Sequence, residues 1–232
     1  MSTQSSARRF ANNGSLRVWQ RAALDKFLAA KPKDFMAVAT PGAGKTTFAL
    51  RVATELMADR TVERVIVVVP TEHLKVQWSE SASRVGLALD PKFTNSSGVN
   101  PAMDGVVVTY AQVGMHPYKH RAVASARRTL VILDEIHHAG DAKSWGDGVR
   151  EAYDDAEHRL ALTGTPFRSD DSQIPFVRAT RKMGKATLSP AQTTRMAMAM
   201  RLPTASCAPL SSSATRANPV GATAPARNTQ RA

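Results

Sequence analysis

The chain has 232 residues, of which 43% are hydrophobic and 22% charged, a composition typical of a folded protein with a sizeable core. Its single cysteine, Cys207, excludes an internal disulfide and a multi-cysteine metal site, and no apolar run approaches the ~18 residues of a membrane span. Residues 1–15 are polar and lack the apolar stretch of a signal peptide, so we expect a flexible N-terminus and a cytoplasmic protein with no membrane partner.

The net charge of +12 is unevenly distributed along the chain. Residues 1–171 contain 22 Lys and Arg and all 19 Asp and Glu (net +3), whereas residues 172–232 contain 9 Lys and Arg and no acid. Ala, Ser, Thr and Pro make up 33 of these last 61 residues, and Leu, Ile, Val and Phe only 7, too few to build a core. We therefore place a boundary near Phe176 and predict a disordered, basic, low-complexity tail over residues 177–232.

Between residues 16 and 168, short β-branched runs alternate with stretches of helical periodicity. Residues 16–28 place Trp19, Ala23 and Phe27 on one helical face, and residues 45–58 are predicted to form a helix. The predicted strands are 35–40, 65–69, 106–110, 130–133 and 159–163. This alternation indicates an α/β domain with a mostly parallel sheet flanked by helices. Because polar motifs follow the strands, we expect one site along the carboxyl edge of the sheet.

A glycine-rich turn follows the first predicted strand. The sequence Ala39-Thr-Pro-Gly-Ala-Gly-Lys-Thr46 matches a P-loop, with alanine in place of the usual first glycine. In a P-loop the backbone amides and the helix N-terminus face phosphate oxygens, the lysine adds a charge, and the hydroxyl after it holds Mg²⁺. The predicted nucleotide-binding residues here are Pro41, Gly42, Ala43, Gly44, Lys45, Thr46 and Thr47. The alternative is an ordinary glycine turn between a strand and a helix.

Two acids, Asp134 and Glu135, follow the apolar run 130–133. Beside a P-loop, Asp134 can bind Mg²⁺ through its water shell, and Glu135 can orient and deprotonate the water that attacks the γ-phosphate. We therefore assign catalytic roles to Lys45, Asp134 and Glu135, and Mg²⁺ binding to Thr46 and Asp134. Taken alone, the same residues could form a strand followed by an acidic turn.

The segment Asp134-Glu-Ile-His137 resembles the DEAH-type box of superfamily 2 helicases and translocases, close to the helicase subunits of restriction enzymes. Residues 16–24, 68–78, 107–112 and 162–168 resemble four further motifs of that family in the same order. The resemblance implies a RecA-like P-loop domain over residues 16–176, the N-terminal lobe of an ATP hydrolase. It also implies ATP and Mg²⁺ as cofactors and a nucleic-acid partner, DNA in preference to RNA.

The resemblance assigns roles to residues outside the P-loop and the acidic pair. It implies that Gln20 reads the adenine edge and that Arg17 lies nearby. It further implies contacts with the nucleic-acid backbone at two strand ends and, at a third, coupling between the nucleotide and the nucleic acid. The residues at those positions are Pro70, Thr71, Gln77, Thr109, Thr163 and Thr165.

The resemblance ends near Phe176, before the second RecA-like lobe that brings an arginine to the transferring phosphate in this family. It thus implies a truncated or frameshifted sequence that binds ATP but turns it over little and does not unwind, with a second lobe or complex subunits as possible partners. A different interpretation is a standalone P-loop nucleotide-binding module whose basic tail docks on nucleic acid. The strand-end motifs favour the helicase, because a simple nucleotide-binding module does not need them.

Overall fold

A computed structural model describes residues 15–137, 143–164, 179–182 and 185–188. The helices are α2 (Val18–Ala30), α3 (Lys45–Ala58), α4 (Glu72–Arg84), α5 (Tyr110–Met115), α6 (Pro117–Ser125) and α7 (Lys143–Tyr153). The strands are β1 (Asp34–Val38), β2 (Arg64–Val69), β3 (Leu89–Asp90), β4 (Gly105–Thr109), β5 (Thr129–Leu133), β6 (His158–Thr163), β7 (Ala179–Lys182) and β8 (Lys185–Leu188).

Six strands form one sheet in the order β1-β6-β5-β2-β4-β3, and all of its strand pairs are parallel. The predicted α/β class and parallel sheet are therefore confirmed, and each of the five predicted strands corresponds to one of these six. Strand β3 has only two residues, too short to show a periodic pattern in the sequence. Strands β7 and β8 form a separate antiparallel pair, which the sequence pattern of the predicted tail does not indicate.

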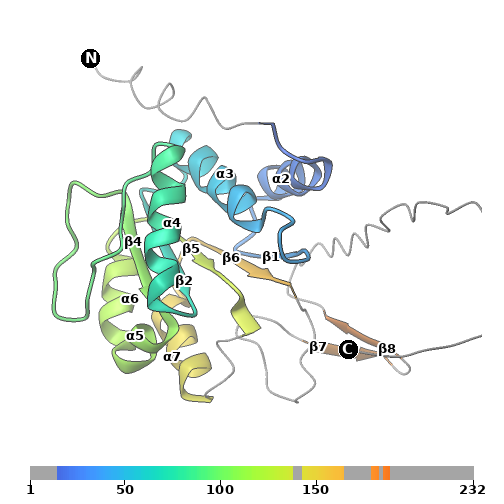
Figure 1. Cartoon of the computed structure of the whole chain (residues 1–232). Coiled ribbons are helices and arrows are strands. Elements are labelled where there is room, and N and C mark those ends of the chain that lie inside the picture. The colour runs from blue at the N-terminus through green and yellow to red at the C-terminus, as the bar shows by residue number, and fades with distance from the viewer. Residues whose placement is uncertain (1–14, 138–142, 165–178, 183–184, 189–232) are drawn as a thin grey trace, which may run out of the picture. The chain divides into compact units, whose positions relative to one another are not determined.

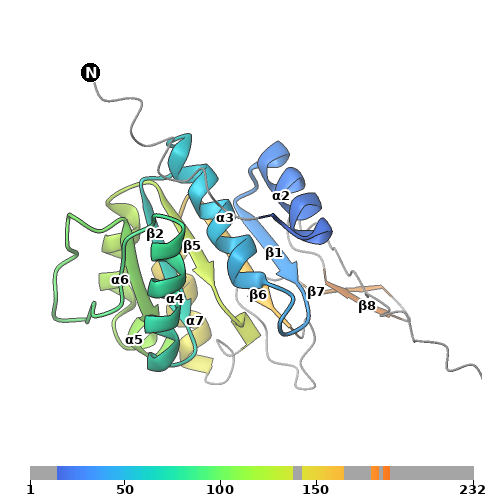
Figure 2. The same ribbon diagram turned by 45° about the horizontal axis from the view of Figure 1, so that its top comes forward.

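Helices cover both faces of the parallel sheet (Figures 1 and 2). Alternate residues of each strand point to opposite faces, so Val65, Val67 and Val69 pack with α2, α3 and α4. Ile66 and Val68 pack on the other face with side chains of α5, α6 and α7. All residues of β2, β4, β5 and β6 are buried, which explains the apolar runs 65–69, 106–108, 130–133 and 160–162 in the sequence.

Helix α2 anchors the edge of the sheet at β1. The predicted apolar face is confirmed, since Trp19, Ala23 and Phe27 are all buried. The Phe27 ring packs edge-on against Phe35 of β1, with ring centroids 5.4 Å apart. The helix ends where Lys31 adopts the left-handed conformation (φ 38°) and donates its N–H to the Phe27 carbonyl at 2.7 Å. This packing places the first turn of α2 beside the loop that follows β1.

The predicted strand 106–110 ends one residue early, at Thr109. The Thr109 hydroxyl accepts the Gln112 N–H at 3.2 Å, and the Gln112 side chain accepts the Thr109 N–H at 2.9 Å. This reciprocal capping box starts α5 at Tyr110.

Helix α7 packs on α5 so closely that a Cβ on Gly148 would lie 3.0 Å from the Gly114 Cα. Among the described helices, none has both the length and the apolar character needed to cross a bilayer.

His120 is a buried residue of α6 that faces Tyr153 of α7. Its Nε2 lies 2.9 Å from Asn95 Oδ1 and its Nδ1 lies 3.4 Å from the Tyr153 hydroxyl, which suits a neutral ring that donates through Nε2. Burial lowers the pKa of His120 from 6.5 to about 4, and His116 and Lys119 add to this effect. The unfolded chain therefore binds a proton between pH 6.5 and 4 that the folded chain does not bind.

We expect the free energy of unfolding to fall by about 2 kcal/mol through His120 alone when the pH drops from 7 to 5. Denaturant unfolding of the chain and of a His120→Gln variant at both pH values measures this contribution as the difference between the two losses. Equal losses in the two proteins would show that His120 has the same pKa in the folded and the unfolded chain.

Candidate functional site

Three sequence motifs meet at the carboxyl edge of the sheet. The P-loop leads from β1 to α3, residues 134–137 follow β5, and Gly164 follows β6, which lies between β1 and β5. Lys45 Nζ lies 3.0 Å from Glu135 Oε1, and the Gly164 N–H donates to Glu135 Oε2 at 3.1 Å. The structure thus brings together the P-loop, the acidic pair and the residue that follows β6 in one hydrogen-bonded cluster.

The P-loop is shaped by two glycines in the left-handed region. Gly42 has a φ of 74° and Gly44 a φ of 89°, values that residues with a Cβ atom rarely adopt. The Ala43 N–H donates to the Thr40 carbonyl at 3.1 Å, which closes the turn before α3 begins at Lys45. The helix therefore starts with its free N–H groups and its positive end at the loop, an arrangement suited to phosphate.

Lys45 points back into the loop and is only 9% exposed. Its Nζ donates to the Ala39 carbonyl at 3.1 Å and pairs with Glu135. Its charge is thus balanced inside the protein by an acid rather than exposed to solvent. A phosphate that uses this lysine must compete with Glu135 for it.

The first turn of α2 donates three hydrogen bonds to consecutive carbonyls of the P-loop. Arg17 Nη1 donates to Gly42 O at 3.1 Å. Trp19 Nε1 donates to Ala43 O at 3.1 Å, and Gln20 Nε2 to Gly44 O at 2.8 Å. We call Arg17, Trp19 and Gln20 the α2 donors; they hold the loop in place through its backbone.

Both polar atoms of the Gln20 side chain have a hydrogen-bond partner in this arrangement. Its Oε1 accepts the Arg17 N–H at 2.8 Å, and the residue is 2% exposed. A Cβ on Gly44 would come within 2.6 Å of Gln20 Nε2, so the contact also requires glycine at position 44. The structure places Arg17 and Gln20 against the P-loop, while adenine reading by Gln20 stays a prediction.

Asp134 is held from three sides. Its backbone N–H donates to Val68 O of β2 at 2.9 Å, and its own carbonyl accepts the Tyr110 hydroxyl at 2.9 Å. Its Oδ2 accepts the indole N–H of Trp78 at 2.8 Å. Burial raises the pKa of Asp134, while the Trp78 hydrogen bond and the Lys45 charge act in the opposite direction. The sequence motifs assign no individual role to Trp78 or Tyr110. Both residues could have been singled out because a buried indole or phenol needs a polar partner.

Glu135 links the acidic pair to β6. Its backbone is in the left-handed region (φ 45°), where a residue with a side chain is under strain. Its Oε2 lies 3.5 Å from His137 Nδ1, and the same ring nitrogen lies 3.2 Å from the Thr163 hydroxyl. The carboxylate is therefore oriented by contacts from the P-loop and from the end of β6.

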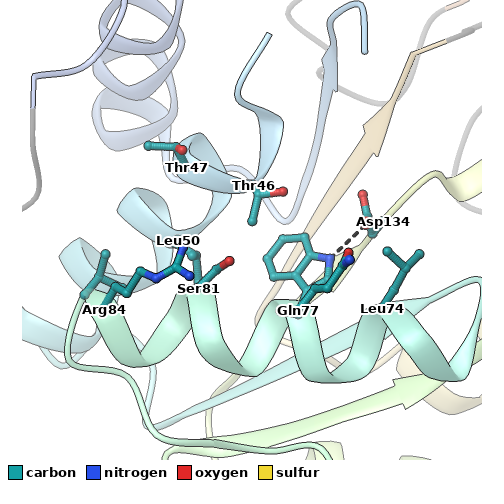
Figure 3. Close-up of a pocket in the computed structure, with 10 residues that line it drawn as sticks. Thr46, Thr47, Leu50, Leu74, Gln77, Ser81, Arg84 and Asp134 are labelled. Atoms are coloured by element: carbon teal, nitrogen blue, oxygen red, sulfur yellow. Dashed lines mark hydrogen bonds between the residues drawn. The ribbon is translucent and has the colours of Figure 1, made fainter. Parts of the chain in front are cut away.

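A groove of about 340 Å³ between α3 and α4 opens beside the acidic pair. Figure 3 shows Thr46 and Asp134 on its wall, and Trp78, which donates to Asp134, also lines the groove. In the described part of the chain, no group of three or more His, Cys, Asp or Glu is placed to hold a metal ion. One hydroxyl and one carboxylate suit Mg²⁺, which keeps several waters and takes its remaining ligands from phosphates. The residues present therefore fit a Mg²⁺–nucleotide.

The predicted nucleic-acid residues divide into two groups. Pro70 is half-buried, and Thr71 and Gln77 are exposed around the first turns of α4. In contrast, the hydroxyls of Thr109 and Thr163 lie inside the protein, where the first caps α5 and the second contacts His137. Thr165 lies outside the described residues. The structure thus leaves Thr71 and Gln77 accessible and gives Thr109 and Thr163 contacts within the lobe.

A parallel sheet with a P-loop after β1 and an acidic pair after β5 defines this chain as the N-terminal RecA-like lobe of a superfamily 2 helicase. A family model described as "Type III restriction enzyme, res subunit" matches residues 13–168, more than half of the chain. The chain belongs to this family.

Curated relatives match a similar share of the chain. An uncharacterized protein of Mycobacterium tuberculosis is 64% identical over 166 residues, which are 71% of this chain and 28% of that protein. A putative DNA 3'-5' helicase Rad25 of Halobacterium salinarum is 32% identical over 160 residues, 68% of this chain and 24% of the helicase. The chain therefore spans about a quarter of the length of these curated relatives.

The fold is also found among solved structures. The SWI2/SNF2 ATPase core of Sulfolobus solfataricus, in complex with dsDNA, superposes with a TM-score of 0.53 at 20% sequence identity. The superposition covers 66% of this chain and 33% of that structure.

Proposed function

We propose that this lobe binds Mg²⁺–ATP in an ATP-dependent helicase or translocase that acts on nucleic acid, DNA in preference to RNA. The observation that carries the proposal is the cluster of Lys45, Glu135 and Gly164, in which three separate motifs lie within hydrogen-bonding distance beside Thr46 and Asp134. If the two motifs were an ordinary glycine turn and an ordinary acidic turn, no ion pair between them would be expected.

Each residue of the site has a proposed task. The loop amides and the N-terminus of α3 bind the phosphates, and Lys45 leaves Glu135 to pair with the terminal phosphate. Thr46 and Asp134 hold Mg²⁺, which when bound neutralises phosphate charge. Glu135, once released, accepts a proton from the attacking water. Cations from a second lobe, in the same or another polypeptide, complete the site for rapid hydrolysis.

DNA is proposed as the partner on three grounds. Thr71 immediately precedes α4 and Gln77 lies within α4 beside the groove, and both are exposed and so available to a phosphate backbone. One relative is named as a putative DNA helicase, and a structure with the same fold contains dsDNA. The 9 Lys and Arg after residue 171, without any acid, add a sequence-independent attraction for nucleic acid.

Thermodynamic linkage tests the proposal. A fluorescent ATP analogue is titrated into the chain with Mg²⁺, alone and with a single-stranded or duplex DNA oligonucleotide. We expect saturable nucleotide binding and a several-fold higher nucleotide affinity with DNA, because two ligands that favour the same conformation raise each other's affinity. Substituting both Thr71 and Gln77 with alanine is expected to remove most of the DNA effect.

The matched control is Ser83→Ala, an exposed substitution near the other end of α4, which should leave the DNA effect unchanged. Nucleotide binding that DNA does not alter would favour the standalone nucleotide-binding module. No binding of the analogue with Mg²⁺ would contradict the nucleotide site itself.

A further inference from the structure

Asp134 receives a hydrogen bond from each of the two helices that begin at the predicted nucleic-acid strand ends. Trp78 lies in α4, which starts just after Thr71, and donates its indole N–H to Oδ2 at 2.8 Å. Tyr110 is the first residue of α5, directly after Thr109, and donates its hydroxyl to the Asp134 carbonyl at 2.9 Å. The two donors come from 56 and 24 residues earlier in the chain, so only the folded lobe brings them to this residue.

We propose that Trp78 and Tyr110 are positioning residues that hold the Asp134 carboxylate in the orientation needed to bind Mg²⁺. This inference rests on the proposed function of the lobe, because it assigns to these two side chains a part in the same metal site. Neither residue is placed in contact with the metal or the nucleotide.

The Trp78 hydrogen bond selects one orientation of the carboxylate. An indole has a single N–H donor, and Trp78 is 3% exposed, so water cannot easily replace its acceptor. The indole N–H binds Oδ2 of Asp134, and Asp134 lines the same groove as Thr46 (Figure 3). The carboxylate also accepts a hydrogen bond from the Glu135 backbone, so removing the indole N–H takes away one of the donors that orient it.

The Tyr110 hydrogen bond fixes the backbone from which the carboxylate extends. Tyr110 is fully buried, so water cannot easily replace the acceptor of its hydroxyl. Its acceptor, the Asp134 carbonyl, lies immediately before Glu135, the residue with a φ of 45°. The bond thus stabilises the turn at which the chain leaves β5 and both acids enter the site.

The test is a Mg²⁺ titration of nucleotide binding by the full chain with a fluorescent ATP analogue. Trp78→Phe and Tyr110→Phe keep an aromatic ring but remove the donor. Changing a residue that orients a metal ligand typically weakens metal binding 10- to 100-fold, so we expect the Mg²⁺ concentration at half-effect to rise about 10-fold in Trp78→Phe. Analogue binding in EDTA should stay within about twofold of the unmodified chain, because a misplaced carboxylate affects only the metal-dependent part.

Two other tryptophan variants separate positioning from packing. Trp145→Phe changes a residue of α7 on the opposite face of the sheet and should leave the Mg²⁺ titration unchanged. Trp19→Phe removes an α2 donor from the P-loop carbonyl of Ala43 and should weaken analogue binding equally with Mg²⁺ and in EDTA. An equal loss in both conditions for Trp78→Phe would assign Trp78 a purely structural role and overturn the inference.

A spectroscopic measurement keeps the inference testable if the variants fold poorly. The chain has three tryptophans and therefore three indole N–H signals in a ¹H–¹⁵N spectrum of the unmodified protein. Adding Mg²⁺ to the analogue complex should shift the Trp78 signal and leave that of Trp145 in place. An unshifted Trp78 signal while Mg²⁺ tightens analogue binding would contradict the inference alone; no effect of Mg²⁺ on analogue binding would contradict the proposed function and the inference with it.

Discussion

Replacing Lys45 with alanine is expected to weaken Mg²⁺–ATP binding by about 10- to 100-fold, the effect of losing a hydrogen bond to a charged group worth about 1.5–3 kcal/mol. The lysine is buried at the start of α3, and its Nζ contacts the Ala39 carbonyl of the P-loop and Glu135. A nucleotide titration monitored by fluorescence anisotropy measures the change.

The control for this substitution is Lys26→Ala, which removes an exposed lysine from α2 and should leave binding unchanged. Circular dichroism of both variants checks that the sheet is intact. Equal affinities of the Lys45→Ala variant and the unmodified chain would show that phosphate binds elsewhere.

Glu135→Gln is expected to act in opposite directions on binding and on hydrolysis. Losing a general base lowers hydrolysis about 10²- to 10⁴-fold. Binding should become tighter by about fivefold, because Lys45 no longer has to leave a carboxylate, a pair worth about 1 kcal/mol at this partial exposure. Single-turnover hydrolysis and the same nucleotide titration give the two quantities.

Glu80→Gln is the matched control, since it removes an equivalent charge from an exposed position of α4. It should change neither quantity. A Glu135→Gln variant that binds nucleotide more weakly than the unmodified chain would show that the Lys45–Glu135 pair does not compete with phosphate.

The sheet could be predicted from the sequence because its strands are buried on both faces. Runs such as residues 65–69 and 130–133 are apolar throughout, and each is followed by a residue that ends it, Pro70 or Asp134. The strand order could not be predicted in this way, because a run that is apolar on both faces contains no pattern that identifies the adjacent strand. The sequence predicts a strand that ends at Tyr110, whereas β4 ends at Thr109 and Tyr110 begins α5. The aromatic side chain of Tyr110 suits a strand and a buried helix start equally well.

The P-loop and the acidic pair could be predicted because their chemistry depends on residue type at fixed spacing. Their mutual geometry could not, since Lys45 and Glu135 meet only through the order of β1, β6 and β5. The same limit applies to Gln20, whose partner is a backbone carbonyl and leaves no trace in the sequence of the loop. Thr109 was assigned to nucleic acid from its place in a motif, while its hydroxyl in the structure caps α5.

The α2 donors have a consequence for the order in which this lobe takes shape. Their hydrogen bonds to the P-loop span 24 or 25 residues of chain, whereas the ion pair between Asp34 of β1 and Arg159 of β6 spans 125. Short connections close first, and a chain made on the ribosome emerges from its N-terminus. We therefore expect α2 and the P-loop to come into contact before β5 and the acidic pair have been synthesised. The ion pair between Lys45 and Glu135 then forms only when β5 joins the sheet.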